Sequence, residues 1–199
     1  MKILAIRLKN LASLAGPFEI DFTAEPLASA GLFAITGPTG AGKSTLLDAL
    51  CLALFGAVPR LGDTGQAKMP DADTDISIGD PRTLIRRGTG GGYAEVDFVG
   101  VSGRRYRARW EANRARDKAS GKLQNSRQSL IDLDSDQLLA SQKTEYKTQL
   151  ELALGLNFEQ FTRAVLLAQS EFSAFLKAND NERSELLEKL TDTALYTQL

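Results

Sequence analysis

A glycine-rich run in the first quarter of the chain restricts its fold more than any other feature. The run fits the phosphate-loop (P-loop) pattern G-x-x-x-x-G-K-[ST] at every fixed position. An apolar run at residues 32–36 precedes it, and a nearly apolar stretch at 43–55 follows it and ends at Gly56. These flanks predict a buried strand, a phosphate-binding loop and a helix, and therefore an α/β fold of the P-loop NTPase class. The run reads Gly37-Pro38-Thr39-Gly40-Ala41-Gly42-Lys43-Ser44-Thr45.

Each part of this run has a chemical task in binding a nucleoside triphosphate. Glycines allow backbone N–H groups to turn toward the phosphates, and the helix that begins near Lys43 points its positive end at them. Lys43 is expected to bind the β- and γ-phosphates, Ser44 to ligate Mg²⁺, and Thr45 to bond the α-phosphate. A glycine-rich turn with a chance Lys-Ser pair is the alternative, and the complete match disfavours it. The loop predicts nucleotide binding but does not define the reaction.

Catalysis by a P-loop enzyme also requires an acidic residue at the end of an apolar strand. No run of four apolar residues followed by Asp-Glu is present, and the apolar run before Asp132 is too short. The Asn-Lys-x-Asp motif of GTPases is also absent, and Asp97 of an Asp-x-x-Gly match lies inside a predicted strand. A self-contained kinase or GTPase is therefore the weaker alternative. We expect the 199 residues alone to bind ATP weakly and to hydrolyse it negligibly.

Hydrophobic periodicity predicts the remaining elements. Alternating residues at 2–9 and 18–22, with Gly16-Pro17 between them, predict a hairpin. Strands are expected at 93–99, 104–111 and 129–133, and residues 57–92 read as irregular. Helices are expected at 144–154, ending at Gly155, at 158–168, and from Asn179 or Asp180 onward.

Composition excludes several classes of chemistry. The chain has no histidine and one cysteine, Cys51, so a histidine-based triad and an imidazole metal site are ruled out. Cys51, in an apolar stretch, fits an inert core position in a reducing compartment. No apolar run reaches the ~20 residues that span a bilayer, and no signal peptide is evident. We therefore expect no membrane partner.

The net charge of −1 conceals a basic segment. Residues 82–127 contain twelve Lys or Arg and four acidic residues, so this segment carries +8 and the rest of the chain −9. Arg105, Arg107 and Arg109 alternate with Tyr106, Ala108 and Trp110, which predicts a basic outer face over an apolar one. That face is interpreted either as a solvated surface or as a row of DNA phosphate contacts. The candidate DNA contacts are Arg104, Arg105 and Arg107.

Several stretches together resemble the SbcC family, the bacterial SMC-like ATPases of double-strand-break repair. The resemblance spans nearly the whole chain, and after the P-loop its most specific part is the segment around Gln169. The stretches that carry it are 2–11 with Lys9-Asn10, 46–50 after the P-loop, 84–88 with Arg86-Arg87, 166–178 around Gln169, the helix at Glu182-Arg183, and 190–196.

The resemblance implies a split ABC-type ATPase head. Residues 1–178 would form its N-terminal lobe, with a mixed sheet, an antiparallel β layer and a helical arm, and residues 179–199 would start a coiled-coil helix. The implied partners are a C-terminal lobe of the same protein, a second head bound through ATP, an SbcD-type metallophosphoesterase nuclease and double-stranded DNA. ATP and Mg²⁺ are the implied cofactors, and a cytoplasmic, nucleoid-associated location is expected. An SMC-type DNA tether without a nuclease is the alternative.

The resemblance also implies roles for residues outside the P-loop. Gln169 would ligate Mg²⁺ and sense the γ-phosphate, and together with Lys43 it would be catalytic. Asn10 would lie near the ribose and phosphates, and Arg86 and Arg87 near the adenosine. Many family members place an arginine shortly after the Lys-Asn pair, whereas Leu11 and Ala12 follow here. The Asp-rich stretch 63–80 looks like an insertion.

Overall fold

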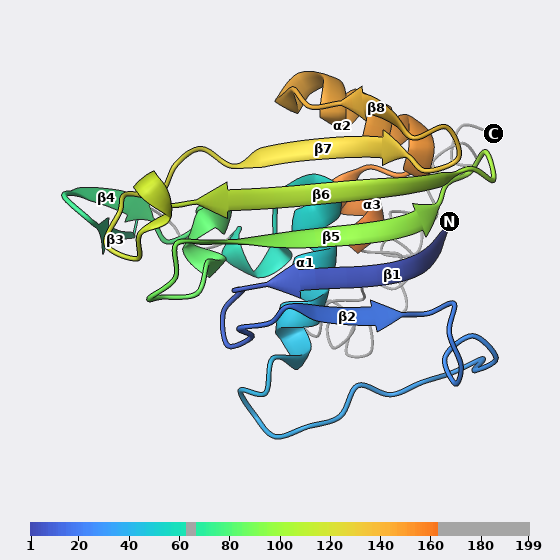
Figure 1. The fold of residues 1–199 in the computed structure, drawn as a ribbon, viewed down its shortest axis with the longest axis horizontal. Helices are drawn as coiled ribbons and strands as arrows, with labels where there is room; N and C mark the ends of the chain where they lie inside the picture. Colours follow the sequence, from blue (N-terminus) through green and yellow to red (C-terminus); the bar gives the residue numbers. More distant parts are fainter. Residues whose placement is uncertain (63–66, 163–199) are drawn as a thin grey trace, which may run out of the picture. The chain divides into compact units, whose positions relative to one another are not determined.

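The computed structural model describes residues 1–62 and 67–162 (Figure 1). The chain divides into two compact units, Met1–Gly155 and a second that begins at Leu156. Of the second unit, the described part is its first turn of helix, α3 (Phe158–Phe161). Its N-cap Asn157 and Gln160 bond reciprocally to each other's backbone N–H groups, which is a capping box.

A six-stranded antiparallel sheet forms the first unit's framework, in the order β2-β1-β5-β6-β7-β8 (Figure 1). The predicted hairpin is confirmed, because β1 and β2 pair from Ala5–Asp21 to Leu8–Phe18. The three further predicted strands are also confirmed, with ends that differ by a few residues. The strands are β1 (Lys2–Lys9), β2 (Phe18–Asp21), β5 (Gly91–Val99), β6 (Arg105–Asn113), β7 (Arg127–Asp132) and β8 (Gln137–Ala140).

Two helices cover one face of this sheet. Helix α1 (Lys43–Phe55) packs on β1, β5 and β6, and α2 (Lys143–Leu154) packs on β7 and β8. Each ends at a glycine in the left-handed region, Gly56 and Gly155, as the sequence predicted. The Tyr146 hydroxyl of α2 donates a 2.6 Å hydrogen bond to the Ala53 carbonyl of α1, and burial raises the pKa of Tyr146. This layer encloses the core, in which Trp110 is buried.

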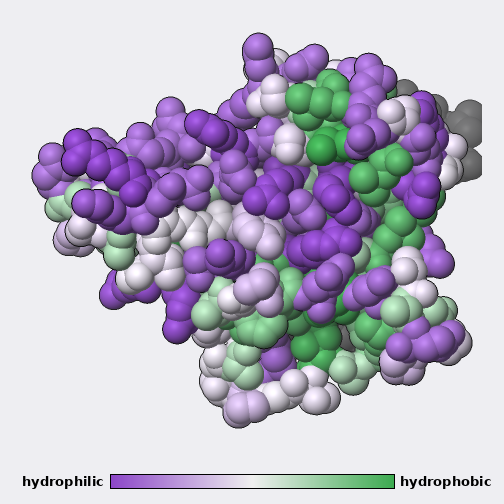
Figure 2. Space-filling view, viewed as in Figure 1, coloured by the Kyte–Doolittle hydropathy of each residue, from purple (hydrophilic) through white to green (hydrophobic). Residues whose placement is uncertain are grey.

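The opposite face of the sheet is polar. Figure 2 shows hydrophilic residues over the middle of this face. Tyr106, Ala108 and Trp110 point into the core, whereas Arg107 and Arg109 pair with acidic residues on the other face. The alternation predicted for this strand is thus confirmed.

A second, two-stranded sheet lies within the stretch expected to be irregular. Strands β3 (Lys68–Asp71) and β4 (Thr74–Ser77) form an antiparallel hairpin. The expectation was wrong here because Pro70 and the aspartates interrupt the alternation of apolar and polar residues that identifies a strand in the sequence. In the structure, Met69 and Ile76 pair directly across the hairpin. Three short 3-10 helices complete the fold: η1 (Pro59–Leu61), η2 (Pro81–Leu84) and η3 (Ala115–Asp117).

The glycine run 90–92 allows three backbone segments to approach closely. A Cβ at Gly90 would overlap the Asp117 carbonyl, and one at Gly91 would overlap the side chain of Asn113. A Cβ at Gly92 would lie 2.6 Å from the Lys9 carbonyl oxygen. The run is thus required where β1, β5 and the segment after β6 meet.

Two further expectations differ from the structure. Every pair of strands described is antiparallel, so the mixed sheet is not found in the described residues. Residues 32–36 form no strand, and Leu32, Phe33 and Ile35 are exposed. A strand that is apolar on both faces requires hydrogen-bonding neighbours and cover on both sides, which the described residues do not supply to this segment.

None of the described helices is long and apolar enough to cross a bilayer. Gln169, most of the predicted helix 158–168 and the predicted coiled-coil start at 179–199 lie outside the described residues.

Candidate nucleotide-binding site

The P-loop forms the exposed turn that leads into α1. Gly37, Gly40 and Gly42 have φ values of 152°, 82° and 96°, which side chains rarely adopt. Lys43 is the first residue of α1 and donates hydrogen bonds of 2.6 and 2.9 Å to the carbonyls of Gly37 and Pro38. The helix thus begins where the sequence predicted, and its positive end opens onto the loop.

The first turn of α1 offers the groups that a magnesium–nucleotide complex requires. Ser44 is exposed, whereas Thr45 is buried. Gly40 has open space where a Cβ would lie, so its backbone is accessible to a ligand. Among the described residues, no group of three acidic or cysteine side chains forms a metal site. The exposed Ser44 hydroxyl is of the chemical kind that ligates Mg²⁺ next to a bound phosphate.

A short turn at residues 10–14 packs against the loop. Leu14 lies so close to Gly42 that a Cβ there would be 2.6 Å from the leucine side chain. The Asn10 carbonyl accepts from the Arg86 backbone, and the Ala12 N–H donates to the Leu84 carbonyl, at 2.9 and 2.8 Å. The turn is therefore held between the P-loop and residues 84–86.

Arg86 supplies a guanidinium to this turn. Its Nη1 donates to the carbonyls of Ala12 and Ser13 at 3.1 and 2.7 Å. An arginine that is distant in the sequence thus holds the backbone of this turn. Arg87, its neighbour, is exposed.

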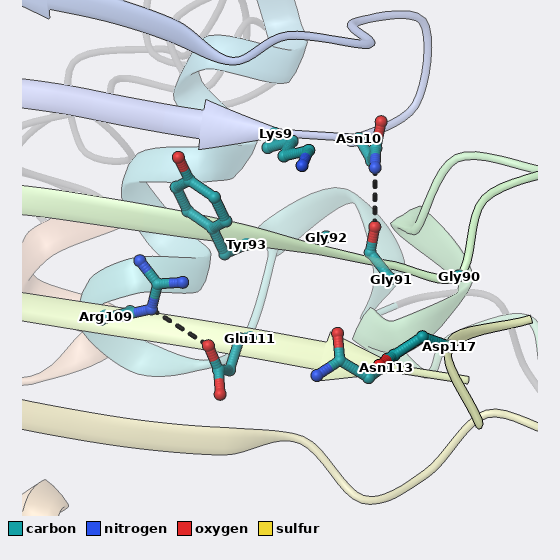
Figure 3. A pocket seen from close by; sticks show the side chains of 10 residues that line it. All are labelled: Lys9, Asn10, Gly90, Gly91, Gly92, Tyr93, Arg109, Glu111, Asn113 and Asp117. Carbon is teal, nitrogen blue, oxygen red and sulfur yellow. Dashed lines mark hydrogen bonds and ion pairs between the residues drawn. The ribbon is translucent and has the colours of Figure 1, made fainter. Parts of the chain in front are cut away.

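The Asn10 side chain bonds to the sheet. Its Nδ2 donates a 2.8 Å hydrogen bond to the Gly91 carbonyl, on the rim of a cavity of about 500 Å³ (Figure 3). This cavity is polar, and Arg109 lies 4.1 Å from the centre of the Tyr93 ring. The P-loop does not line it. In this arrangement Asn10 fixes the end of β1 to β5.

Asp48 and Arg60 form a pair that the sequence motifs did not identify. Asp48 is buried in α1, one turn after Ser44, and one of its carboxylate oxygens accepts bonds of 2.5 and 2.9 Å from the Arg60 guanidinium. The pair ties η1 to the helix that carries the P-loop. A carboxylate within an otherwise apolar helix was the available signal in the sequence.

The structure places the candidate DNA contacts in ion pairs. Arg104 bonds the buried Asp132 at 2.6 Å, and Arg105 bonds Asp134 at 2.7 Å. Arg107 bonds Asp97 at 2.7 Å. Asp132, the acid considered for catalysis, is therefore engaged with Arg104, and it also accepts from the backbone of the turn that follows β7.

An apolar cavity of about 360 Å³ is lined by the segment before the P-loop, by β1 and β2, and by α1. Phe33, Ile35 and Leu47 line it and remain part exposed, and the Phe22 and Phe33 rings lie 5.3 Å apart. The segment that precedes the P-loop thus contacts the sheet on one side and presents apolar side chains to solvent.

Comparison with known proteins agrees with this site. The profile of the AAA domain family matches residues 5–199, which include the whole P-loop. The chain is 71% identical over its full length to the SbcC subunit of the SbcCD nuclease of Pseudomonas aeruginosa, and 54% identical over 98% of its length to that of Rhodobacter capsulatus. The Bacillus subtilis protein of the same name is 31% identical over 98% of the chain. The chain spans about a sixth of the length of these relatives, 17%, 16% and 16%. The chain therefore belongs to the AAA domain family and is similar along its length to the SbcC subunits of SbcCD nucleases.

Proposed function

We propose that this chain is the ATP-binding part of an ATPase that acts within an SbcCD-type nuclease complex. The observation that carries the proposal is the P-loop, with three glycines in conformations other residues disfavour and Lys43 at the start of α1. The names of the relatives, each the SbcC subunit of an SbcCD nuclease, support the nuclease complex over a tether without a nuclease. They also disfavour a self-contained kinase or GTPase.

In this proposal the loop binds the phosphates of ATP and the metal ion that accompanies them. Backbone N–H groups of Gly37 and of residues 39–42, together with the N-terminal end of α1, would surround the phosphates, and Ser44 would ligate Mg²⁺. The Lys43 ammonium, which here donates to the carbonyls of Gly37 and Pro38, would bind the β- and γ-phosphates of the nucleotide. Gln169 as a second Mg²⁺ ligand and γ-phosphate sensor remains a proposal that rests on the family resemblance.

We also propose that further parts of the ATPase assemble around this chain. The exposed apolar residues before the P-loop, Leu32, Phe33 and Ile35, support a C-terminal lobe as a neighbour. The lack of a suitably placed acidic residue in the sequence supports the same view. A second ATP-bound head, an SbcD-type nuclease partner and double-stranded DNA are the other proposed partners.

Removal of the Lys43 charge tests the proposed ATP site. We expect Lys43→Ala to weaken binding of a fluorescent ATP analogue by at least ~10-fold, because a charge-assisted phosphate contact is lost. Lys147→Ala, on the exposed side of α2, is the matched control and should bind like the wild type. Equal affinities for Lys43→Ala and the wild type would contradict the proposal. In the full-length protein, ATP turnover should fall with the same variant.

A further inference from the structure

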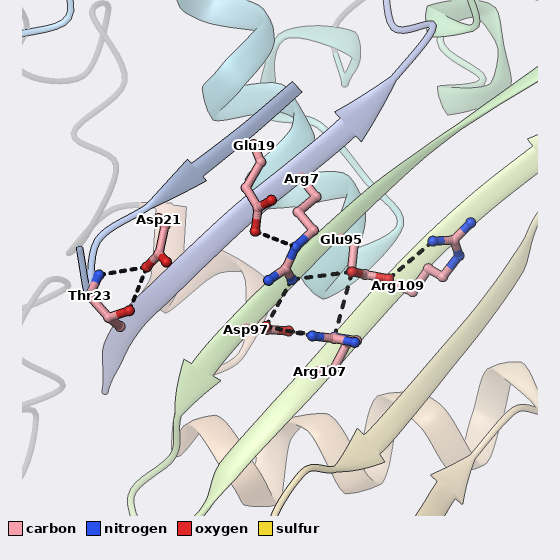
Figure 4. Close-up of polar contacts among 8 residues, drawn as sticks. All are labelled: Arg7, Glu19, Asp21, Thr23, Glu95, Asp97, Arg107 and Arg109. Atoms are coloured by element: carbon pink, nitrogen blue, oxygen red, sulfur yellow. Dashed lines mark hydrogen bonds and ion pairs between the residues drawn. The ribbon is translucent and has the colours of Figure 1, made fainter. Parts of the chain in front are cut away.

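The basic segment 82–127 separates into two parts when its ion pairs are followed. On the sheet face, three arginines, Arg7, Arg107 and Arg109, share one network with four carboxylates. Figure 4 shows the three arginines with three of these carboxylates. Arg104 and Arg105 have partners of their own, as described above. The carboxylates of the network are Glu19, Glu95, Asp97 and Glu111. This face therefore carries no excess positive charge, despite its row of arginines.

The second part is the connection between β6 and β7, which contains η3. Arg116, Lys118 and Lys122 are exposed here, and none of them forms an ion pair with another residue in the described ranges. Asp117 is the one acidic residue in the sequence from 114 to 127. Figure 2 shows hydrophilic residues gathered over the end of the sheet where η3 and the β3–β4 hairpin lie. We call Arg116, Lys118 and Lys122 the basic tip.

The basic tip is anchored by buried contacts. Arg114 bonds the buried Asp71 of β3 at 2.7 Å and also donates to the Gly121 carbonyl. The second Asp71 oxygen accepts from the Leu123 N–H at 2.9 Å. One carboxylate from the Asp-rich stretch thus closes both ends of the loop that presents the tip. We call these contacts of Asp71 with Arg114 and Leu123 the Asp71 latch. The latch gives a structural role to the Asp-rich stretch 63–80, which looked like an insertion in the sequence.

We propose that the basic tip binds the phosphate backbone of double-stranded DNA. The proposal rests on the proposed function and adds the contact surface to it. A duplex carries one negative charge per ~1.7 Å of its axis, and unpaired lysine and arginine side chains on an anchored loop are complementary to such an array. The residues from 112 to 127 contain no aromatic side chain on which an unpaired base could stack. Contacts of this kind give affinity without sequence recognition.

The salt dependence of DNA binding tests the proposal. The variant is Arg116→Gln/Lys118→Gln/Lys122→Gln in the full-length protein assembled with its nuclease partner. Fluorescence anisotropy measures its affinity for a labelled duplex of ~30 base pairs between ~50 and ~200 mM salt. We expect at least ~10-fold weaker binding at the lowest salt and a log–log salt slope shallower by about 2 to 3, because each lost phosphate contact removes ~0.9 from the slope.

The control removes three exposed charges elsewhere. The variant Lys2→Gln/Lys143→Gln/Lys147→Gln lowers the net charge by the same amount as the tip variant, but its substitutions lie on β1 and α2. It should leave the salt slope unchanged. An unchanged slope in the tip variant, an equal change in the control, or a larger loss with a length-matched single strand than with the duplex would overturn the proposal. Binding of the ATP analogue is measured in parallel. If the wild-type protein does not bind the ATP analogue, the proposed ATP site is contradicted. If the analogue binds but the tip variant keeps the wild-type salt slope for DNA, only the proposed role of the basic tip is contradicted.

Discussion

Asp97 shows how a single residue depends on its neighbours across the sheet. Burial opposes ionisation of this carboxyl, but hydrogen bonds from Arg107 and Arg7 hold its pKa below the usual value. The same hydrogen bond with Asp97 raises the pKa of Arg107. Four strands supply the members of this network, so the ion pairs connect strands that are distant in sequence (Figure 4).

The lowered pKa of Asp97 predicts a dependence of stability on pH. A carboxyl with a depressed pKa in the folded state stabilises the fold above its unfolded pKa of ~3.9, and this contribution is lost as pH falls through the folded value. We expect Asp97→Asn to lower the free energy of unfolding by ~1–3 kcal/mol at neutral pH. The difference from the wild type should shrink below about pH 4. Urea unfolding at several pH values measures it.

The exposed Asp73→Asn on the β3–β4 hairpin is the control for this measurement, and its effect should be small at every pH. A difference between Asp97→Asn and the wild type that stays constant from neutral to acid pH would contradict the assignment.

Burial and pairing also set the chemical state of Cys51 and of the Asp48–Arg60 pair in and beside α1. Burial raises the pKa of the Cys51 thiol to about 12, so it stays protonated and unreactive at neutral pH. This agrees with the inert core position expected from the sequence. Asp48 and Arg60 stay paired next to the P-loop, and the hydrogen bond that Arg60 donates to Asp48 raises the pKa of Arg60.

Single glycines and one aspartate control the position of whole elements. Gly42 is the N-cap of the P-loop helix, and Leu14 of the turn at 10–14 lies against this glycine. The β3–β4 hairpin is joined to the connection between β6 and β7 through Asp71. These joints are short and specific, and they bring together stretches that are distant in the sequence.

Loss of the Asp71 latch should release the hairpin and the loop together. We expect Asp71→Ala to lower the free energy of unfolding by about 3 kcal/mol or more, because Arg114 is left without its partner in a mostly buried position. Amide hydrogen exchange should rise at residues 68–77 and 114–123 and remain unchanged in α1. Asp75→Ala, exposed on the same hairpin, is the matched control. Unchanged exchange at 114–123 would show that Asp71 does not anchor the loop.

At the scale of the whole molecule, the chain combines a complete sheet-and-helix unit with an exposed apolar segment. Residues 32–36 precede the P-loop, and the described part of the chain covers them on one side only. The relatives are about six times longer than the chain. In the proposed assembly, the C-terminal lobe would cover this apolar segment.

The exposed segment predicts where another lobe attaches. When the 199-residue chain is co-expressed with the remaining polypeptide as a separate chain, Ile35→Asp should reduce their association by at least ~10-fold, because a charge would be buried. Leu152→Asp, on an exposed position of α2, should associate normally. The wild-type pair should hydrolyse ATP, whereas the 199-residue chain alone should not. Turnover by the isolated chain, or normal association of Ile35→Asp, would contradict this assembly.

The sequence alone determined much of the local structure of this protein, although not the β3–β4 hairpin or the conformation of residues 32–36. Fixed glycines and a lysine define the P-loop, period-two alternation defines β1, β2, β5, β6 and β7, and glycine caps define the ends of α1 and α2. These features depend on neighbours in the chain, so the residues themselves carry the information.

Tertiary structure decided which of these residues are paired. The row of arginines on β6 reads as a basic surface in the sequence. In the structure, carboxylates from β5, from β6 itself and from the turn after β7 neutralise much of it. The apolar run at 32–36 shows the same limit for burial. Its sequence reads as a buried strand, but in the described residues it has no neighbouring strand. Charge pairing and burial depend on segments that are distant in sequence and are brought together by folding, so residue patterns along the chain do not contain them.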